Sequence, residues 1–268
     1  MSVLAPSGVD RIARAFARAR EERRLALAVY LTVGYPDRAS SPALLRAALD
    51  GGADLLELGV AFSDPMADGT TIQRASEAAL RAGVRLADCL AEARALVAER
   101  GAPVLLMGYF NPFLRYGVAR LAEECRAAGV AGVIVPDLPA EESAELDAAL
   151  RPAGVARIDL YAPTTPDERL ERLLPAARGF VYCVSLTGVT GARAVLAEDT
   201  AAFVARVRAR TTLPVAVGFG ISRPEHVRAL RGVADGVIVG SAAIDAISAG
   251  GERALRDLVR SLREACAA

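Results

Sequence analysis

The segment Val215-Ala-Val-Gly-Phe-Gly-Ile-Ser222 joins a short apolar run to a glycine-rich turn. Residues 215–218 have the composition of a strand buried on both faces, and the glycines that follow allow a sharp turn of the backbone. Similar junctions occur before it, at Gly188-Val-Thr-Gly191, and after it, at Gly240-Ser-Ala-Ala243. Three consecutive junctions of this kind are typical of the loops that follow the last strands of a (β/α)8 barrel.

Apolar runs alternate with amphipathic segments of helical period along the whole sequence. This pattern predicts one α/β domain over residues 1–268, a TIM barrel with an extra N-terminal helix. An open doubly wound sheet is the alternative, but its glycine-rich turn would usually follow the first strand. The expected strands are 25–32, 53–58, 104–107, 132–135, 157–161, 180–184, 215–218 and 236–239. The expected helices are 9–22, 41–50, 73–82, 86–99, 116–128, 141–150, 166–177, 200–209, 224–230 and 253–267.

The charge and composition exclude several classes of partner. Lysine plus arginine and aspartate plus glutamate number 32 each, so no net field attracts nucleic acid or an anionic membrane. No apolar run approaches the roughly 20 residues of a membrane span, and the N-terminal residues lack a signal-peptide core. The four cysteines show no C-x-x-C spacing and are interpreted as reduced thiols. We therefore expect a cytoplasmic protein.

Two absences restrict the chemistry further. The sequence contains no lysine, which excludes Schiff-base aldolase chemistry, lysine-linked pyridoxal phosphate and a P-loop lysine. His226 is the only histidine, which excludes a multi-histidine metal cage and disfavours a Ser-His-Asp triad. We expect neither metal nor cofactor, and acid–base catalysis must therefore come from carboxylates.

The three glycine-rich turns together predict a phosphate site. Glycine lets the backbone approach an anion closely, and free N–H groups at the start of a helix point toward it. The helix dipole contributes only about 0.3 to 2 kcal/mol, so direct N–H hydrogen bonds must supply most of the affinity. Each turn alone is better explained as a helix cap or a tight turn. Only the set of three favours phosphate binding.

Residues 53–59, Ala-Asp-Leu-Leu-Glu-Leu-Gly, place Glu57 near the carboxyl end of an otherwise apolar strand. Barrel active sites lie at that end. Burial raises the pKa of a carboxyl group, which suits Glu57 to donate a proton near neutral pH. The alternative is a structural ion pair between Glu57 and an arginine. Asp54, earlier on the strand, is expected to pair or cap at the opposite face.

The stretch from Glu57 to Gly69, Glu-Leu-Gly-Val-Ala-Phe-Ser-Asp-Pro-Met-Ala-Asp-Gly, resembles the signature of the tryptophan synthase alpha chain family. It contains a polar loop that is long for a βα connection, and such loops are often functional. The resemblance covers about residues 10–265. Further matches follow at residues 34–37 (Gly-Tyr-Pro-Asp), 107–112 (Met-Gly-Tyr-Phe-Asn-Pro), 136–142 (Pro-Asp-Leu-Pro-Ala-Glu-Glu), 163–166 (Pro-Thr-Thr-Pro), 188–191, 218–222 and 240–242.

This resemblance implies a lyase of tryptophan biosynthesis that cleaves indole-3-glycerol phosphate to indole and glyceraldehyde 3-phosphate. It implies a cofactor-free retro-aldol reaction, and an alpha2beta2 tetramer formed with a beta chain. By motif position, Glu57 matches the acid–base residue and Asp68 the partner of the indole nitrogen. The matched substrate-binding positions are Tyr109, Tyr182, Thr190, Gly191, Phe219, Gly220, Gly240 and Ser241. Core packing is the alternative role for the three aromatic residues among them.

Two residues depart from the family pattern. Ala61 and Thr70 stand where the family usually has proline, in the loop that the family uses to contact the beta chain and to close over substrate. Proline fixes φ, so these substitutions give the loop more freedom and put dependence on a partner in question. The alternative function is a stand-alone indole-3-glycerol phosphate lyase that releases free indole. Two further alternatives are a phosphate-binding barrel epimerase, which would need more histidines, and a binding scaffold without catalysis.

Overall fold

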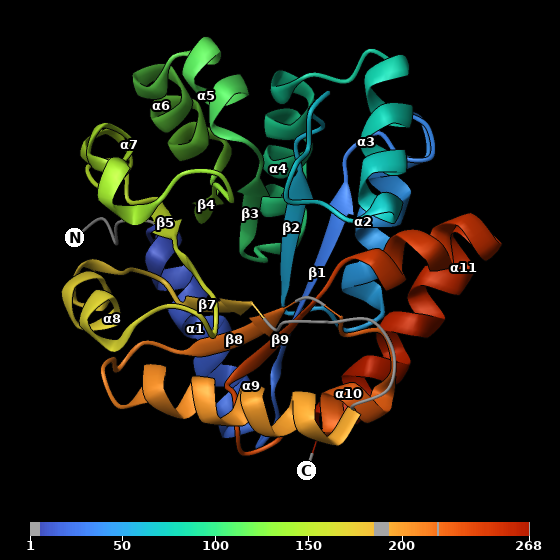
Figure 1. The fold of residues 1–268 in the computed structure, drawn as a ribbon. Helices are drawn as coiled ribbons and strands as arrows, with labels where there is room; N and C mark the ends of the chain where they lie inside the picture. The colour runs from blue at the N-terminus through green and yellow to red at the C-terminus, as the bar shows by residue number, and fades with distance from the viewer. Residues whose placement is uncertain (1–5, 185–192, 219, 268) are drawn as a thin grey trace, which may run out of the picture.

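Nine parallel strands form one sheet in the computed structural model, which describes residues 6–184, 193–218 and 220–267 (Figure 1). The order along the sheet is β5-β4-β3-β2-β1-β9-β8-β7-β6. The first strand pairs on one side with β2 and on the other with the last strand, β9, which is barrel topology and excludes the doubly wound alternative. The strands are β1 (Ala26–Thr32), β2 (Leu55–Gly59), β3 (Val104–Met107), β4 (Gly132–Ile134), β5 (Ala156–Ile158), β6 (Leu160–Tyr161), β7 (Val181–Val184), β8 (Val215–Gly218) and β9 (Gly236–Val239).

The sequence predicts eight strands, and the ninth arises because the predicted fifth strand is interrupted at Asp159. Its first part, β5, pairs with β4, and its second part, β6, pairs with β7. The Asp159 carbonyl still accepts a hydrogen bond from Tyr182 N at 3.2 Å. The segment from Ala156 to Tyr161 therefore joins the two ends of the sheet, as one strand of an eight-stranded barrel would.

Helices cover the outside of the barrel (Figure 1). Three predicted helices differ most from the structure: α9 begins at Arg193 and not at residue 200, and glycines account for the other two differences. Gly117, with φ of 94°, separates an unpredicted helix α5 from α6. The predicted helix 253–267 corresponds to the second part of α11, and non-helical angles at Gly250 and Gly251 separate it from a first part, beginning at Ser241, that was not predicted. The helices are α1 (Gly8–Glu21), α2 (Ser41–Asp50), α3 (Thr70–Arg81), α4 (Leu86–Arg100), α5 (Phe110–Tyr116), α6 (Val118–Ala128), α7 (Ala144–Leu150), α8 (Asp167–Leu173), α9 (Arg193–Arg208), α10 (Pro224–Arg228) and α11 (Ser241–Cys266), with 3-10 turns at Ala140–Glu142 and Leu174–Ala176.

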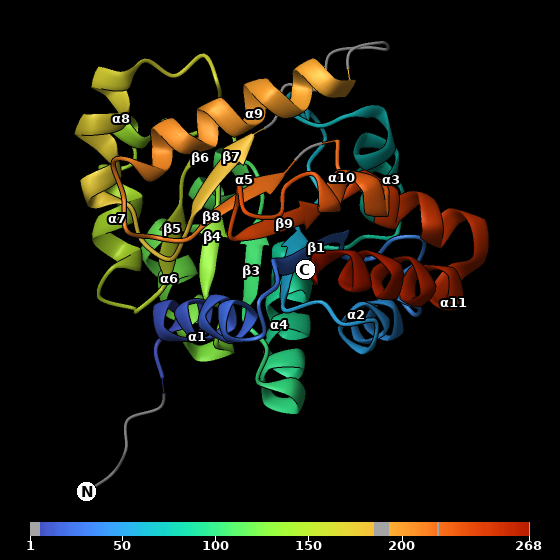
Figure 2. The same ribbon diagram turned by 90° about the horizontal axis from the view of Figure 1, so that it is seen from below.

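The barrel interior is a packed core, and α1 lies across its lower end (Figure 2). Phe16 of α1 stacks on Phe180, which precedes β7, with ring centroids 5.4 Å apart. A Cβ atom on Gly236, the first residue of β9, would lie 2.9 Å from the Phe16 ring. The amino ends of the strands are therefore sealed, and a substrate must enter from the carboxyl ends. Among the described residues, no helix is long and apolar enough to span a membrane.

Candidate active site

The cross-strand register of β2 directs Glu57 into the barrel. Glu57 pairs with Tyr30 on β1 and with Leu105 on β3, and residues in register on neighbouring strands project from the same face. Leu55, two residues earlier, belongs to the interior cluster. Glu57 therefore lies one layer above the apolar filling of the barrel, toward the carboxyl ends of the strands.

The Glu57 carboxyl group is completely buried. Neither of its oxygens has a hydrogen-bond partner within the part of the chain that the structure describes, and no described arginine forms an ion pair with it. Burial raises the pKa of Glu57 to about 8. Glu57 is therefore mostly protonated at pH 7. The ion-pair alternative is wrong for the described residues, and the arrangement suits a proton donor.

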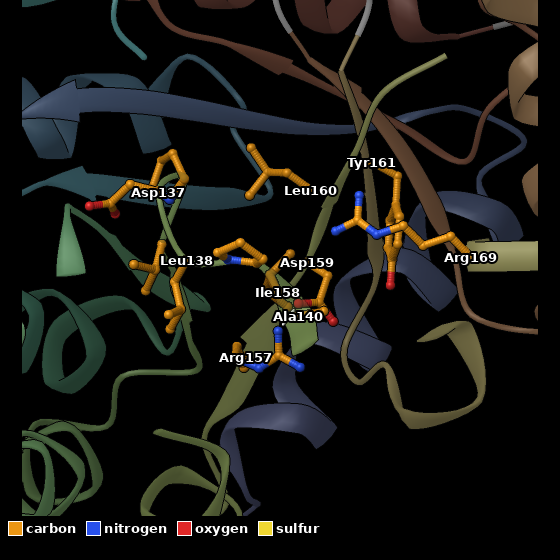
Figure 3. A pocket seen from close by; sticks show the side chains of 12 residues that line it. Asp137, Leu138, Ala140, Arg157, Ile158, Asp159, Leu160, Tyr161 and Arg169 are labelled. Carbon is orange, nitrogen blue, oxygen red and sulfur yellow. Dashed lines mark ion pairs between the residues drawn. The ribbon is translucent and has the colours of Figure 1, made fainter. Parts of the chain in front are cut away.

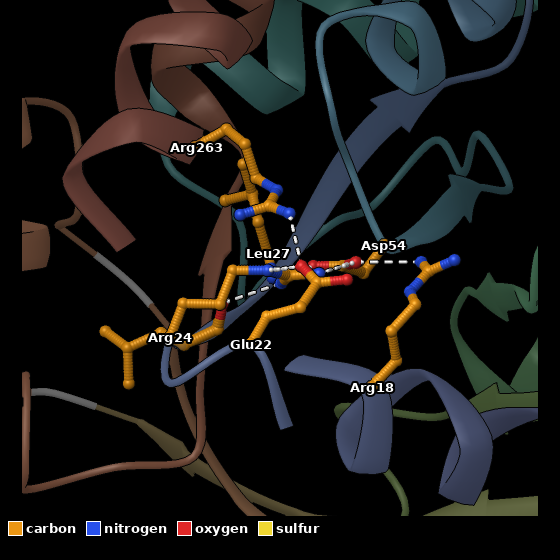
Figure 4. A network of polar contacts seen from close by, with 7 residues as sticks. Arg18, Glu22, Arg24, Leu27, Asp54 and Arg263 are labelled. Carbon is orange, nitrogen blue, oxygen red and sulfur yellow. Dashed lines mark hydrogen bonds and ion pairs between the residues drawn. The ribbon is translucent and has the colours of Figure 1, made fainter. Parts of the chain in front are cut away.

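Asp54 precedes Glu57 by three residues and has the opposite surroundings (Figure 4). Its carboxylate accepts hydrogen bonds from the Arg24 guanidinium at 2.6 and 2.9 Å and from Arg18 at 3.0 Å. The Leu27 amide donates a further bond at 3.0 Å. Asp54 thus pairs at the lower face of the barrel, as predicted, and takes no part in the upper cavity.

Asp68 reaches the mouth of the barrel on the long loop between β2 and α3. The loop holds itself in shape, because Asp68 N donates to Pro65 O at 3.1 Å and Gln73 Nε2 donates to Asp68 O at 2.9 Å. Burial raises the pKa of Asp68 to about 6, although a hydrogen bond with Tyr109 lowers it in part. The Tyr109 hydroxyl also accepts a bond from Ala67 N at 2.9 Å. Asp68 is therefore mostly anionic at neutral pH, while Glu57 is mostly neutral.

Both carboxyl groups open into one cavity of about 320 Å³ at the carboxyl ends of the strands. Its lining combines apolar side chains with three glycines and a few polar groups, and small-molecule sites are usually largely apolar with few polar groups. Tyr109 contacts Asp68 but is not among the lining residues. The cavity is lined by Tyr30, Glu57, Asp68, Gly69, Ile72, Met107, Tyr182, Gly220, Ile221, Ser222, Ile238, Gly240, Ser241 and Ala242.

Two tyrosine rings enter the cavity over glycines. A Cβ atom on Gly59 would lie 2.1 Å from the Tyr30 hydroxyl oxygen, and one on Gly218 would lie 2.1 Å from that of Tyr182. Larger residues at either glycine would displace the phenol that it accommodates. Burial, followed by the charge of Glu57, raises the pKa of Tyr182 well above its usual value. Both hydroxyl groups therefore remain protonated and can donate hydrogen bonds near the carboxylates.

Tyr30 is a cavity residue that the sequence analysis missed. Its hydroxyl lies 3.2 Å from Thr32 Oγ1, and burial, together with the charges of Asp68 and Glu57, raises its pKa. The signal was present in the sequence, because alternate residues of the first strand face the interior and Tyr30 stands near its carboxyl end. The register that places Tyr30 beside Glu57 could not be read from the sequence alone.

The predicted phosphate turns fall partly within the described residues. Gly220, with φ of 74°, Gly240 and Ser241 all line the cavity, and Ser241 is the first residue of α11. The start of that helix therefore faces the cavity. Thr190, Gly191 and Phe219 lie outside the described residues.

A second cavity, of about 250 Å³, lies between the chain after β4 and the segment around Asp159 (Figure 3). Its charged groups are largely paired, since Arg157 forms ion pairs with Asp147 and Asp159, and Arg169 pairs with Glu141. The Tyr161 hydroxyl has no partner among the described residues. None of the proposed catalytic or phosphate-binding residues lines this cavity, so the upper cavity is the better candidate for the active site.

A sequence model described as "Tryptophan synthase alpha chain" matches residues 16–267. The chain belongs to the tryptophan synthase alpha chain family. Among similar proteins, the tryptophan synthase alpha chain of Roseiflexus castenholzii is 56% identical over 261 residues, which are 95% of this chain and 100% of that one. The one from Nocardia farcinica is 46% identical over 255 residues, covering 95% of both chains.

Solved structures agree with this assignment. A chain of Mycobacterium tuberculosis tryptophan synthase superimposes with a TM-score of 0.90 at 41% identity and covers 98% of this chain and 100% of its own. Tryptophan synthase subunit alpha from Legionella pneumophila gives 0.89 at 35% identity, with coverage of 98% and 99%. Tryptophan synthase alpha chains are lyases of tryptophan biosynthesis that cleave indole-3-glycerol phosphate as partners of a beta chain. Membership therefore does not favour the stand-alone lyase.

Proposed function

We propose that Glu57 and Asp68 divide the acid–base work of indole-3-glycerol phosphate cleavage in this chain. The observation that carries the proposal is the contrast between a buried, unpaired Glu57 with a pKa of about 8 and an Asp68 with a pKa of about 6 on the same cavity. Two carboxyl groups whose surroundings separate their pKa values are suited to opposite roles. Glu57 is the acid, and Asp68 is the anion.

The reaction needs one proton delivered and one removed. Glu57 donates its proton to C3 of the indole, and Asp68 stabilises the positive charge that this leaves on the ring N–H. The Glu57 carboxylate then takes the proton of the glycerol hydroxyl next to the ring. The carbon–carbon bond breaks, its electron pair returns to the indole, and the hydroxyl carbon becomes the aldehyde of glyceraldehyde 3-phosphate. Glu57 ends protonated, so the cycle needs no outside acid or base.

The substrate phosphate is assigned to the glycine-rich side of the cavity. Backbone N–H groups of Gly220, Gly240 and Ser241 supply the hydrogen bonds, with the start of α11 adding a favourable dipole. Tyr109 and Tyr182 are assigned to the wall around the indole ring. Thr190, Gly191 and Phe219 keep their assignment as substrate-binding residues on the motif match alone.

Three properties of the whole chain belong to the same proposal. One continuous sheet and a family match over residues 16–267 support a single domain. Assembly with the beta chain is proposed to give an alpha2beta2 tetramer. Membership in a family of biosynthetic enzymes supports a cytoplasmic location.

The decisive experiment measures indole formation from indole-3-glycerol phosphate by the purified chain, alone and with a tryptophan synthase beta chain. We expect slow cleavage alone and an increase of up to about a hundredfold with the beta chain, the upper range of coupling between binding sites. No indole under either condition would refute the proposed function. Equal rates under both conditions would instead support a stand-alone lyase. The loop that contains Ala61 and Thr70 would then be the part of the chain that explains why no beta chain is needed.

The companion variant is Asp68→Asn. It keeps the shape of the side chain but removes the negative charge that is assigned to the indole nitrogen. We expect kcat to fall by about two orders of magnitude, the effect of removing one electrostatic stabiliser from a transition state. Retention of more than a tenth of the wild-type kcat would show that Asp68 does not have this role.

A further inference from the structure

The single histidine of the chain contacts the turn Gly220–Ser222, whose first residue is assigned to the substrate phosphate. His226, on α10, places its ring nitrogen Nδ1 3.1 Å from the Gly220 carbonyl oxygen and 3.3 Å from the Ser222 amide nitrogen. Both residues line the active-site cavity, and so does Ile221 between them. The imidazole, which is not among the residues that line the cavity, therefore contacts both ends of this three-residue turn.

One ring nitrogen cannot serve both partners at once. Nδ1 accepts a hydrogen bond from Ser222 N only when it carries no proton, and it donates to the Gly220 carbonyl only when it carries one. The two contacts therefore describe two states of the ring. In the first state the Ser222 N–H is occupied by the imidazole. In the second, the Gly220 carbonyl is held and the Ser222 N–H is released.

We propose that His226 is a positioning residue whose Nδ1 proton decides whether the Ser222 amide is available to a phosphate group. This inference rests on the proposed function, because it takes the Gly220–Ser222 turn as part of the phosphate site. Without phosphate, Nδ1 accepts from Ser222 N. With phosphate bound, the Ser222 N–H donates to a phosphate oxygen. The imidazole then carries its proton on Nδ1 and donates it to the Gly220 carbonyl.

The exchange is favourable because the new hydrogen bond is the stronger one. An N–H bond to a phosphate oxygen is charge-assisted, whereas the bond from Ser222 N to a neutral imidazole is not. The Gly220 carbonyl keeps the turn anchored during the exchange, so the φ of 74° at Gly220 is preserved. The ring nitrogen Nε2 can take up or release the balancing proton, because His226 is only half-buried.

Nitrogen NMR of the histidine ring tests this inference directly. Because the chain contains one histidine, selective ¹⁵N-histidine labelling gives the signals of His226 alone. We expect Nδ1 to be unprotonated without phosphate and protonated when inorganic phosphate saturates the site, at fixed pH and with chloride matching the ionic strength. A ring whose Nδ1 has the same state with and without bound phosphate overturns the inference.

Variants at the same position supply an independent test in the complex with the beta chain. His226→Phe removes both contacts, and we expect the inhibition constant of inorganic phosphate and the KM of indole-3-glycerol phosphate to rise about five- to tenfold, the effect of one lost hydrogen bond, while kcat changes much less. His226→Gln offers both a donor and an acceptor to the turn and should recover most of the affinity. Glu225→Gln, on the same short helix, is the matched control, because the Glu225 side chain pairs with Arg228 and not with the turn among the described residues.

The outcomes separate this inference from the proposed function. If His226→Phe binds inorganic phosphate as tightly as Glu225→Gln does, the inference is wrong and the phosphate site stands. If inorganic phosphate neither inhibits the wild-type complex nor perturbs the Gly220 and Ser222 amides, the phosphate assignment itself fails, and the inference fails with it.

Discussion

Two buried carboxyl groups, Asp54 directly before strand β2 and Glu57 within it, have completely different surroundings. Asp54, at the lower end, receives bonds from two arginines and a backbone amide (Figure 4). Glu57, three residues later, receives none from the described residues. Four hydrogen bonds hold the Asp54 carboxylate in one position. A buried carboxyl without partners is held neutral by desolvation of its charged form, and it can change charge when a substrate supplies the partners. Asp54 thus contributes to stability and Glu57 to the proposed catalysis, although only three residues separate them.

Glu57→Gln gives the largest expected effect on this comparison. The amide keeps the volume of the carboxyl but cannot transfer a proton, so we expect cleavage of indole-3-glycerol phosphate to fall by about 10² to 10⁴-fold, the range for general acid–base catalysis. The measurement is the initial rate of indole formation with the beta chain present. Retention of more than a tenth of wild-type activity would show that Glu57 is not the acid.

Asp54→Asn tests the carboxylate that directly precedes the strand. Removing this carboxylate leaves the buried Arg24 without its main partner, and breaking a buried ion pair costs about 3 to 5 kcal/mol. We expect that loss in the free energy of unfolding, measured by urea denaturation at pH 7, while kcat of the folded enzyme stays near the wild-type value. A variant that is as stable as wild type but has a low kcat would reverse the division of roles.

The dependence of stability on pH should differ between wild type and Glu57→Gln. The folded pKa of Glu57 is about 8, above its unfolded value of 4.5, so the folded state binds the proton more tightly. The resulting stabilisation is complete below about pH 4.5 and is lost as pH rises through 8. We expect the variant to lack this decline and to exceed wild type by a few kcal/mol near pH 9. Urea denaturation from pH 5 to 9 measures the free energy of unfolding of both proteins. The same dependence on pH in wild type and variant would contradict the raised pKa of Glu57.

Activity should show a related pH profile. Cleavage needs Glu57 protonated and Asp68 ionised, so kcat/KM should fall below about pH 6 and above about pH 8. Tyr109→Phe removes the hydrogen bond that lowers the pKa of Asp68. We therefore expect the acid limb of that variant to move to higher pH while the basic limb stays in place. A shift of both limbs, or of neither, would argue against separate roles.

The sequence predicted those features that depend on local pattern. The run Val215–Gly218 and the position of Glu57 near the end of a buried strand were both correct. Features that depend on contacts between distant strands were not predicted. Asp159 interrupts a strand that is apolar on either side of it, and Tyr30 comes beside Glu57 only through the register of β1 and β2. Such pairings involve residues about 27 positions apart, and local propensity carries no information on them.

Arg18→Gln has the smallest expected effect, and it separates the contributions of the two arginines that bind Asp54. Both Arg18 and Arg24 bind Asp54, but the side chain of Arg18 is 59% exposed whereas that of Arg24 is 2% exposed. Exposed ion pairs contribute about 0 to 1 kcal/mol because water screens them and their side chains lose freedom. We expect a loss in that range for Arg18→Gln in urea denaturation, and several times more for Arg24→Gln. Equal losses in the free energy of unfolding would mean that both arginines stabilise the protein equally through Asp54. The stabilisation would then come from the whole network and not from the buried Arg24–Asp54 pair.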